Sequence, residues 1–310
     1  MSIIVFTDSR CLEHHVPYGF PELPERLEVL VKGLSQAGVE VDEGGVYAGA
    51  EEAIAAVHSA DYVSRFREAV EKGQGFLDTG DNPLSPGTWS AAGAAVETSL
   101  RAADWVQQQP DRVALAAVRP PGHHAERAMA MGFCYFNNVA VTAEHLLATG
   151  AAERVAIVDY DVHHGNGTQH IFEDRAEVLY VSTHQYPFYP GTGAADERGR
   201  EAGEGATVNI PLPAGSGDDQ YRAAFQAGVL PALRQFAPDI LLVSTGFDSW
   251  QDDPVGGMRV SELAFRQWGK WLREVADESC RGRILLVLEG GYDIEALPVL
   301  TLAHFEGLAG

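Results

Sequence analysis

Short runs of aliphatic and β-branched residues recur along the chain, and segments with helical periodicity separate them. The runs of strand length cover residues 2–6, 113–118, 155–158, 178–182, 240–244 and 284–288. The helical segments cover residues 25–36, 60–71, 89–107, 137–148, 219–235 and 261–276. Continuous apolar strands that alternate with helices are typical of a parallel sheet covered on both faces. The pattern therefore predicts a three-layer α/β/α fold with a central, mainly parallel sheet, formed by residues 1–310 as a single domain.

Three segments do not follow this alternation. Residues 8–24 and 185–213, and the shorter segment 74–88, are rich in glycine, proline, histidine and aromatic residues and have little periodicity. Loops of this length in a compact domain are usually functional. We therefore expect these segments to be loops that serve the function of the protein.

The composition limits the kinds of partner that the protein can bind. With 44 acidic and 22 basic residues the net charge is −22, a field that repels nucleic acid. There is no apolar stretch of about 18 residues, and the N-terminus lacks the features of a signal peptide, so we expect no membrane contact and a cytoplasmic location. The three cysteines are widely spaced and form no CxxC pair, which argues for a reducing compartment and against a thiolate zinc site. The composition leaves open whether the chain forms a homo-oligomer.

Polar clusters follow the ends of five of the predicted strands. His123 and His124 come after the second strand, and residues 159–164 come directly after the third. His184, Asp248 and residues 289–293 follow the remaining three. Ligands of open α/β sheets bind in the crevice beyond the carboxyl ends of the strands. We therefore expect the five clusters to converge on one site.

The cluster at 159–164 indicates a metal site. Asp161 and His163 lie two residues apart, so on an extended backbone their side chains point to the same side. A catalytic zinc ion takes three protein ligands and keeps one position open, and Asp248 is the natural third ligand. Asp159 and Asp161 could instead be helix caps or turn residues partnered by histidines, but the convergence of several clusters favours a metal. The residues predict a hydrolase with one zinc ion, although this donor set also suits iron(II).

At these positions the sequence resembles the zinc-dependent histone deacetylase superfamily, which includes bacterial deacetylase-like amidohydrolases and acetylpolyamine amidohydrolases. The matching stretches are RPPGHHAERAMAMGFCYFNN, VDYDVHHGNGTQHIF, FYPGTG, GFDSWQDDP and LEGGYD. The motif DVHHGNGTQ is similar to the corresponding motif of the class II branch. The resemblance implies an arginase/deacetylase-type α/β fold, which agrees with the strand pattern.

The resemblance implies a zinc site and a pair of histidines beside it. Asp161, His163 and Asp248 match the zinc ligands of the family. His123 and His124 match its tandem histidines, of which the second is the expected general base and acid.

The resemblance also implies partners for these histidines and a third catalytic side chain. Asp159 matches the carboxylate that partners His123, and Asn166 matches the partner of His124, where class I members carry aspartate. Tyr292 matches the tyrosine that polarises the acyl carbonyl. A metal and this hydroxyl can together stabilise the oxyanion that forms when water attacks an amide.

The remaining matches concern the substrate tunnel and a second ion. Gly132, Phe133 and Tyr189 match residues that line the acyl-lysine tunnel, and Asp81 matches the carboxylate at its rim. Arg26 matches an arginine near the internal cavity of the family. A structural potassium site is implied by the match of Asp159, Asp161, His163, Ser182 and Thr183.

Several functions remain open at this level. The expected activity is zinc-dependent hydrolysis of the amide of acetyl-lysine, in a peptide or in another small acylated amine. Acetylpolyamine hydrolysis is the second hypothesis, although Val255 stands where some polyamine deacetylases carry a glutamate that binds a second ammonium group. A scaffold that only binds acyl-lysine is a weaker third, because the metal ligands, the histidine pair and Tyr292 are all present.

Two further features bear on the reaction and on the substrate. A two-metal ureohydrolase is disfavoured, because Gly165 and Trp250 stand where that class needs further aspartates. Phe20 replaces the histidine of the family's usual His-Pro-Glu pattern, which changes the expected rim. Charge at the rim could come from Glu13, Glu22, Asp252 and Asp253.

Overall fold

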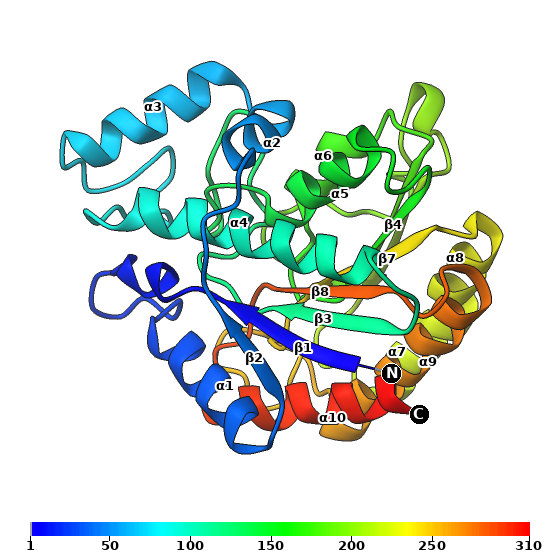
Figure 1. Cartoon of the computed structure of the whole chain (residues 1–310). Helices are drawn as coiled ribbons and strands as arrows, with labels where there is room; N and C mark the ends of the chain where they lie inside the picture. Colours follow the sequence, from blue (N-terminus) through cyan, green and yellow to red (C-terminus); the bar gives the residue numbers. More distant parts are fainter. Residues whose placement is uncertain (1) are drawn as a thin grey trace.

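Eight strands form one sheet in the computed structural model, which describes residues 2–310 (Figure 1). Their order in the sheet is β2-β1-β3-β8-β7-β4-β5-β6, and every neighbouring pair is parallel. The strands are β1 (Ser2–Thr7), β2 (Glu40–Glu43), β3 (Arg112–Ala116), β4 (Val155–Asp159), β5 (Val178–Gln185), β6 (Thr207–Leu212), β7 (Ile240–Thr245) and β8 (Ile284–Leu288).

Helices cover both faces of this sheet, as Figure 1 shows. One face carries α1 (Glu25–Gln36), α9 (Glu262–Ser279) and α10 (Leu297–Ala309), and α7 (Asp218–Ala224) and α8 (Leu230–Phe236) pack on α9. The opposite side holds α2 (Ala50–Val57), α3 (Ala60–Glu71), α4 (Thr88–Gln107), α5 (Asn138–Ala148) and α6 (Asn166–Phe172). Three short helical segments complete the described elements. They are the 3₁₀ helices η1 (Ser9–Glu13) and η2 (Glu201–Gly203) and the π-helix η3 (Phe225–Val229), which joins α7 to α8.

The predicted three-layer α/β/α class is confirmed, and each of the six predicted strands is present with small shifts at its ends. The expectation that residues 185–213 form only a loop was wrong, because β6 lies within them. The edge strands β2 and β6 lack a continuous apolar run, since β2 reads EVDE and Pro211 interrupts β6. Helix α10 has apolar residues around its whole circumference and so shows no amphipathic period.

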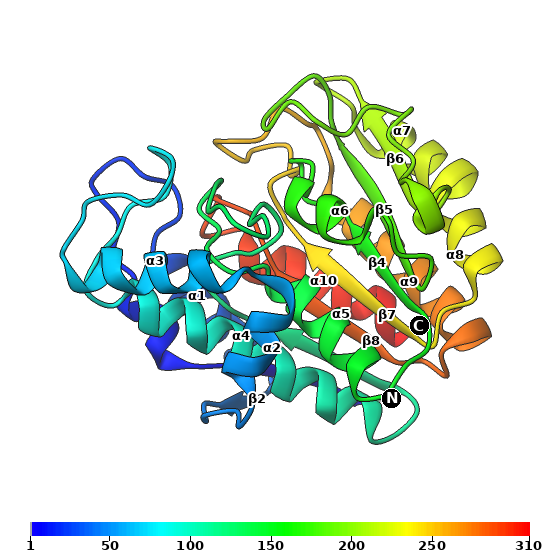
Figure 2. The same ribbon diagram turned by 90° about the horizontal axis from the view of Figure 1, so that it is seen from above.

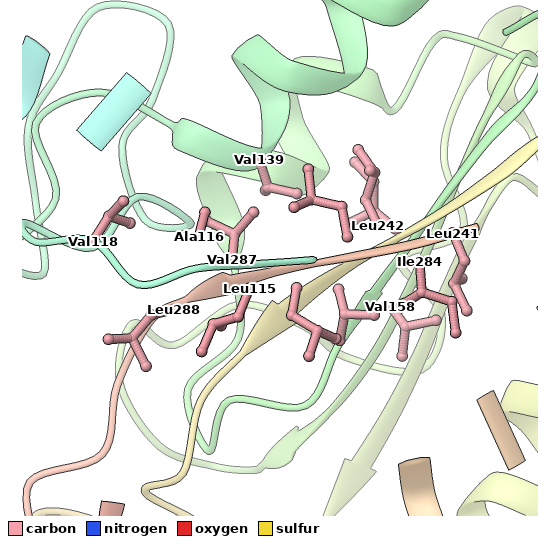
Figure 3. Close-up of a cluster of buried hydrophobic side chains, with 14 of the residues drawn as sticks. Leu115, Ala116, Val118, Val139, Val158, Leu241, Leu242, Ile284, Val287 and Leu288 are labelled. Atoms are coloured by element: carbon pink, nitrogen blue, oxygen red, sulfur yellow. The ribbon is translucent and has the colours of Figure 1, made fainter. Parts of the chain in front are cut away.

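The core lies on both faces of the central strands. Figure 3 shows Ala116 and Leu242 on the side of the sheet that faces Val139 of α5, whereas Leu115 and Leu288 point to the other side. The side chains of β4, β7 and β8 are buried along their whole length. Strands buried on both faces need apolar residues at every position rather than at alternate ones, which explains why these segments read as continuous apolar runs.

The parallel arrangement sends all strands toward one edge of the sheet. Figure 2 shows the long connecting loops on the side of the molecule away from the two chain ends. The polar clusters leave β3, β4, β7 and β8, which are adjacent in the sheet. Within residues 2–310 no helix has both the length and the hydropathy needed to cross a membrane.

Truncation of a core side chain in β7 provides a test of this packing. Leu242 is 0% exposed, so Leu242→Ala should lower the free energy of unfolding by about 2–5 kcal/mol, through lost burial and the cavity left behind. Leu263 on α9 is 65% exposed, and Leu263→Ala should change it by less than about 0.5 kcal/mol. Urea unfolding followed by circular dichroism measures both. Equal effects of the two substitutions would contradict the assignment of the core.

Candidate metal centre and active site

Two carboxylates and one imidazole meet beyond the ends of β4 and β7. Asp161, His163 and Asp248 are buried, and one ligand atom from each lies within 4.8 Å of the others. The Nδ1 atom of His163 is 3.0 Å from Oδ1 of Asp161 and 3.1 Å from Oδ2 of Asp248. Among residues 2–310 this is the one cluster of three such side chains close enough to share an ion. Two carboxylates and an imidazole form a donor set of the kind that zinc accepts in catalytic sites.

Backbone amides fix the orientation of both carboxylates. Val162 N donates to Oδ1 of Asp248 at 2.8 Å, and Gly290 N donates to Oδ2 of Asp161 at 2.8 Å. The ring of His163 stacks on Phe188 with the ring centroids 5.1 Å apart. The ligand atoms are therefore held in place by β4, β7 and β8 and by an aromatic neighbour.

The close approach of the chain to the carboxylates requires glycine at two positions. A Cβ atom on Gly290 would overlap Oδ2 of Asp248 and lie 2.6 Å from Oδ2 of Asp161. A Cβ atom on Gly246 would overlap the carboxylate of Asp161. Both glycines thus leave room for the pair of aspartates.

The charges at this centre are strongly coupled. Burial, together with the negative charge of Asp161, raises the pKa of Asp248 to about 7. Burial alone would lower the pKa of His163, but hydrogen bonds to Asp161 and Asp248 raise it to about 9. Two buried carboxylates this close repel each other unless a cation lies between them. The centre therefore fits a divalent metal ion in charge as well as in donor type.

Two adjacent histidines lie next to this centre in different electrostatic surroundings. His123 Nδ1 is 3.0 Å from Oδ2 of Asp159, and His124 Nδ1 is 2.8 Å from Oδ1 of Asn166. Burial opposes protonation of His123, but the charges of Asp159, Asp161 and Glu289 raise its pKa to about 10.

His124 shows the opposite behaviour. Burial, followed by the charges of His123 and His163, lowers its pKa well below the ordinary value. Because Asn166 Oδ1 accepts the Nδ1–H, the free lone pair of a neutral His124 is on Nε2. This histidine can take up a proton, whereas His123 holds one.

Glu289 positions the histidine pair, a role that the sequence did not indicate. Its carboxylate accepts hydrogen bonds from Gly122 N at 2.6 Å, His123 N at 3.1 Å and the Ser244 hydroxyl at 3.2 Å. Burial raises its pKa to about 7. Its place directly after β8, in the LEGGYD motif, was the available signal, but only the three-dimensional contacts reveal its partners.

Asp253 holds the backbone of Tyr292, a second role that the sequence did not indicate. Oδ2 of Asp253 accepts from Tyr292 N at 2.7 Å and from Asp293 N at 3.3 Å, and Oδ1 accepts from Val255 N and Gly256 N. Asp253 is therefore not a source of free charge at the rim, contrary to one expectation, because its oxygens are occupied by backbone amides.

Glu22 is a second correction of the same kind. It is completely buried, and its carboxylate pairs with Arg26 at 2.9 Å and Arg119 at 2.7 Å. Arg26 donates in turn to the carbonyls of Glu289 and Gly291, and its guanidinium lies 4.8 Å from the centre of the Tyr292 ring. The pair thus supports the turn that carries Tyr292. Glu13 and Asp252 are exposed, but neither lines the site.

One cavity of about 290 Å³ connects these groups with the solvent. Its lining consists of Asp81, Pro121, His123, His124, Gly132, Phe133, His163, Phe188, Tyr189, Val255, Gly290 and Tyr292. This lining includes all five residues that the sequence places at the substrate tunnel or its rim: Asp81, Gly132, Phe133, Tyr189 and Val255. Phe133 adopts φ +67°, a left-handed conformation that costs energy in a non-glycine residue and is often found at functional sites.

The rim carboxylate is already engaged in hydrogen bonds. Asp81 accepts from Gly132 N at 3.1 Å, from the Tyr189 hydroxyl at 2.9 Å and from the Thr79 hydroxyl. It is the only acidic residue in the cavity lining as described. Val255 adds an apolar surface to the same wall.

Of the five residues expected to bind potassium, Asp161 and His163 belong to the metal centre, and the other three lie on β4 and β5. Asp159 and Ser182 are register partners of β4 and β5. The Ser182 hydroxyl is 2.8 Å from Nδ1 of His184, and the Thr183 hydroxyl is buried without a hydrogen-bond partner among the described residues.

Gly165 and Trp250 stand where a two-metal enzyme would need aspartates, and each has a structural role here. A Cβ atom on Gly165 would overlap Oδ2 of Asp159 and lie 2.7 Å from the Tyr180 hydroxyl. The Trp250 indole donates to Asp293 at 3.2 Å.

Comparison with known proteins places this architecture in a family. Residues 20–308 match the model of the histone deacetylase domain. A probable deacetylase of Archaeoglobus fulgidus is 38% identical over 96% of this chain and 84% of its own length. The human polyamine deacetylase HDAC10 is 40% identical over 93% of this chain and 44% of its own length. The solved structure of an acetylpolyamine aminohydrolase from Burkholderia pseudomallei superposes with a TM-score of 0.89, with 34% identity, over 100% of this chain and 99% of that one. The resemblance seen in the sequence motifs is thereby confirmed, and the chain belongs to the histone deacetylase family.

Proposed function

We propose that the protein is a zinc-dependent amidohydrolase that removes the acyl group from acetyl-lysine or a related small acylated amine. The observation that carries the proposal is the meeting of three kinds of group in one cavity. These are the three-ligand centre, which borders the cavity through His163, and the side chains of His124 and Tyr292, which line it. Membership of a family of deacetylases supports hydrolysis of a linear amide.

Asp161, His163 and Asp248 are the residues that would hold the ion. When bound there, zinc supplies a Lewis acid for the amide carbonyl and lowers the pKa of the attacking water. His124 accepts the proton of this water at Nε2 and later delivers it to the leaving amine. The charged His123 beside it keeps its proton through the pairing with Asp159.

Tyr292 stabilises the oxyanion, and the aromatic walls hold the acyl chain. Burial raises the pKa of the Tyr292 phenol well above its ordinary value, so the hydroxyl remains a hydrogen-bond donor at neutral pH. Phe133, Phe188 and Tyr189 present apolar surface along which the methylene groups of a lysine side chain can pack.

A structural potassium ion is part of this proposal. Its expected ligands are Asp159, Asp161, His163, Ser182 and Thr183. Support comes from the hydroxyl of Thr183, which has no hydrogen-bond partner within residues 2–310, and from the pairing of Asp159 opposite Ser182 in the sheet. The location in a cytoplasm is likewise a proposal, supported by three buried cysteines that remain free thiols.

Acetylpolyamine hydrolysis is the second candidate. The similarity to a human polyamine deacetylase and to an acetylpolyamine aminohydrolase favours it. Against it, Val255 is apolar and Asp253 is bound by backbone amides, so the described cavity offers only Asp81 to a second ammonium group. We therefore place acyl-lysine first.

Metal content is the first test of the proposal. The purified protein should contain about one zinc ion per chain, and His163→Ala or Asp248→Asn should reduce this content at least tenfold, because each removes one of three ligands. Asp252→Asn, which alters an exposed acid of the same loop, is the control. Elemental analysis measures zinc and iron together. Unchanged zinc and iron content in both ligand variants, or two zinc or iron ions per chain, would overturn the assignment of the centre.

Turnover is the second test. Wild-type protein should hydrolyse a fluorogenic acetyl-lysine peptide, and Tyr292→Phe and His124→Ala should each lower kcat by about 10²–10⁴, the usual worth of an oxyanion donor or a general base. Both variants should keep their zinc, and Tyr18→Phe at an exposed position should match the wild type. Acetylputrescine is assayed in parallel. A much higher kcat/KM for acetylputrescine would reverse the order of the two candidates, and absence of turnover with both would refute the enzyme.

Asp253→Asn tests how Tyr292 is positioned. An amide has one acceptor oxygen where the carboxylate has two, so at least one pair of backbone N–H groups loses its partner and faces an NH₂ group instead. We expect kcat to fall about tenfold to a hundredfold, because the tyrosine is displaced, with little change in zinc content. Asp252→Asn again serves as the control. Full activity of the Asp253 variant would show that the turn holds Tyr292 without this carboxylate.

A further inference from the structure

The partner of His124 is an amide, and an amide has two different ends. Asn166 presents Oδ1 to Nδ1 of His124 at 2.8 Å. If the amide were turned over, its NH₂ group would face the same nitrogen and would favour the other tautomer of the imidazole, with the proton on Nε2. A histidine with its proton on Nε2 cannot accept one there. The orientation of Asn166 therefore decides whether His124 can act as a base.

A carboxylate on the far side of Asn166 determines this orientation. Nδ2 of Asn166 donates to Oε1 of Glu126 at 2.5 Å and to the carbonyl of His124 at 3.3 Å. An ionised carboxylate accepts hydrogen bonds and donates none. Both acceptors therefore select the NH₂ end of the amide and turn its oxygen toward His124, and the charged Oε1 of Glu126 forms the shorter of the two bonds.

Glu126 is itself held in place from two sides. Nδ1 of His170, on α6, lies 2.8 Å from the same Oε1 atom, and the bond to Glu126 raises the pKa of His170. The backbone of Glu126 is bound as well, since its N–H donates to the Met129 carbonyl at 2.9 Å and its carbonyl is 3.0 Å from Nδ1 of His58. The Glu126 side chain is 19% exposed and that of His170 is 38% exposed, so the row of contacts runs from the solvent to the active site.

We propose that Glu126 is a positioning residue that fixes the Asn166 amide and thereby keeps the proton of His124 on Nδ1. The inference rests on the proposed function, in which His124 Nε2 takes a proton from water. The negative charge of Glu126 also polarises the amide, because hydrogen bonds in a chain strengthen one another. The uncharged Asn166 thus gains part of the acceptor strength that an aspartate would have at this position.

An ordinary surface ion pair does not account for these contacts. An exposed Glu–His pair adds little to the stability of a protein and needs no third partner. Here one oxygen atom accepts from the exposed His170 and from the buried amide that contacts His124. The two explanations differ in what they predict for catalysis.

A pair of substitutions tested in two backgrounds distinguishes them. Glu126→Gln should lower kcat about tenfold with KM little changed, because the charge-assisted bond is lost and only the longer bond to the His124 carbonyl still orients the amide. Asn166→Asp alone should also impair the enzyme, because it puts two carboxylates side by side. In the Asn166→Asp background, however, Glu126→Gln should raise kcat, because the glutamine amide donates to the new carboxylate. The effect of one substitution thus changes sign with the background.

Controls separate this effect from a general loss of charge or stability. Glu173→Gln removes a nearby acid that pairs with Arg200 and has no contact with Asn166, and it should leave kcat and KM unchanged. The urea midpoint of every variant is measured. An equal effect of Glu126→Gln in both backgrounds, or no effect in either, would overturn the proposal.

A spectroscopic measurement tests the proposal without any substrate. In zinc-loaded protein labelled with ¹⁵N-histidine, the two ring nitrogens of His124, assigned by comparison with His124→Ala, should have the shifts of the Nδ1–H tautomer. Glu126→Gln should shift them toward a mixture of the two tautomers, and Glu173→Gln should not. Unaltered shifts in Glu126→Gln would refute the positioning role even if the protein is an active deacetylase. Lack of turnover by the wild type would refute only the proposed function.

Discussion

The burial of negative charge is the constraint on which the rest of this site depends. Asp159, Asp161, Asp248 and Glu289 are all completely buried at one edge of the sheet. An unpaired carboxylate in such surroundings is very costly, and neighbouring carboxylates raise one another's pKa. Backbone N–H groups and the charged imidazole of His123 stabilise these carboxylates. A cation would fit between Asp161 and Asp248 and would stabilise them further.

Much of the local backbone follows from this constraint. Parallel strands all end at the same edge of the sheet, so the loops that follow β4, β7 and β8 lie side by side. The N–H groups of one loop can therefore donate to the aspartate of another. Such crossing contacts require the chain to come very close to the carboxylates, which explains the glycines at 246 and 290. Asp253, which follows Asp248 in the same loop, is stabilised in the same way, because its carboxylate accepts hydrogen bonds from four backbone amides. The metal centre and the turn of Tyr292 are thus parts of one hydrogen-bonded arrangement.

The sequence could predict the residues that do chemistry better than those that hold them. Asp161, His163 and Asp248 stand out because carboxylates and imidazoles directly after apolar strands are unusual, and the structure brings them together. Glu289 also follows an apolar strand, but only the three-dimensional contacts show which amides it binds. Asp253 carries no comparable signal, since a buried carboxylate that binds amides has the same letter as an exposed one. Glu22 and Asp253 were candidates for rim charge for that reason. The edge strand β6 was missed because its apolar residues Val208, Ile210 and Leu212 alternate with polar ones and with Pro211, so it lacks the continuous apolar run of the central strands. Helix α10 was missed because its apolar residues are not confined to one face.

The two histidines show how one site can contain a proton holder and a proton acceptor only one residue apart. Their rings are 4.1 Å apart and equally enclosed, so burial does not distinguish them. What differs is the partner at Nδ1: a carboxylate for His123 and a neutral amide for His124. A second carboxylate directly on His124 would stabilise its protonated form and reduce its use as a base. With Glu126 beyond Asn166, the negative charge lies one residue further away, where it can orient the amide and strengthen its oxygen without pairing directly with His124.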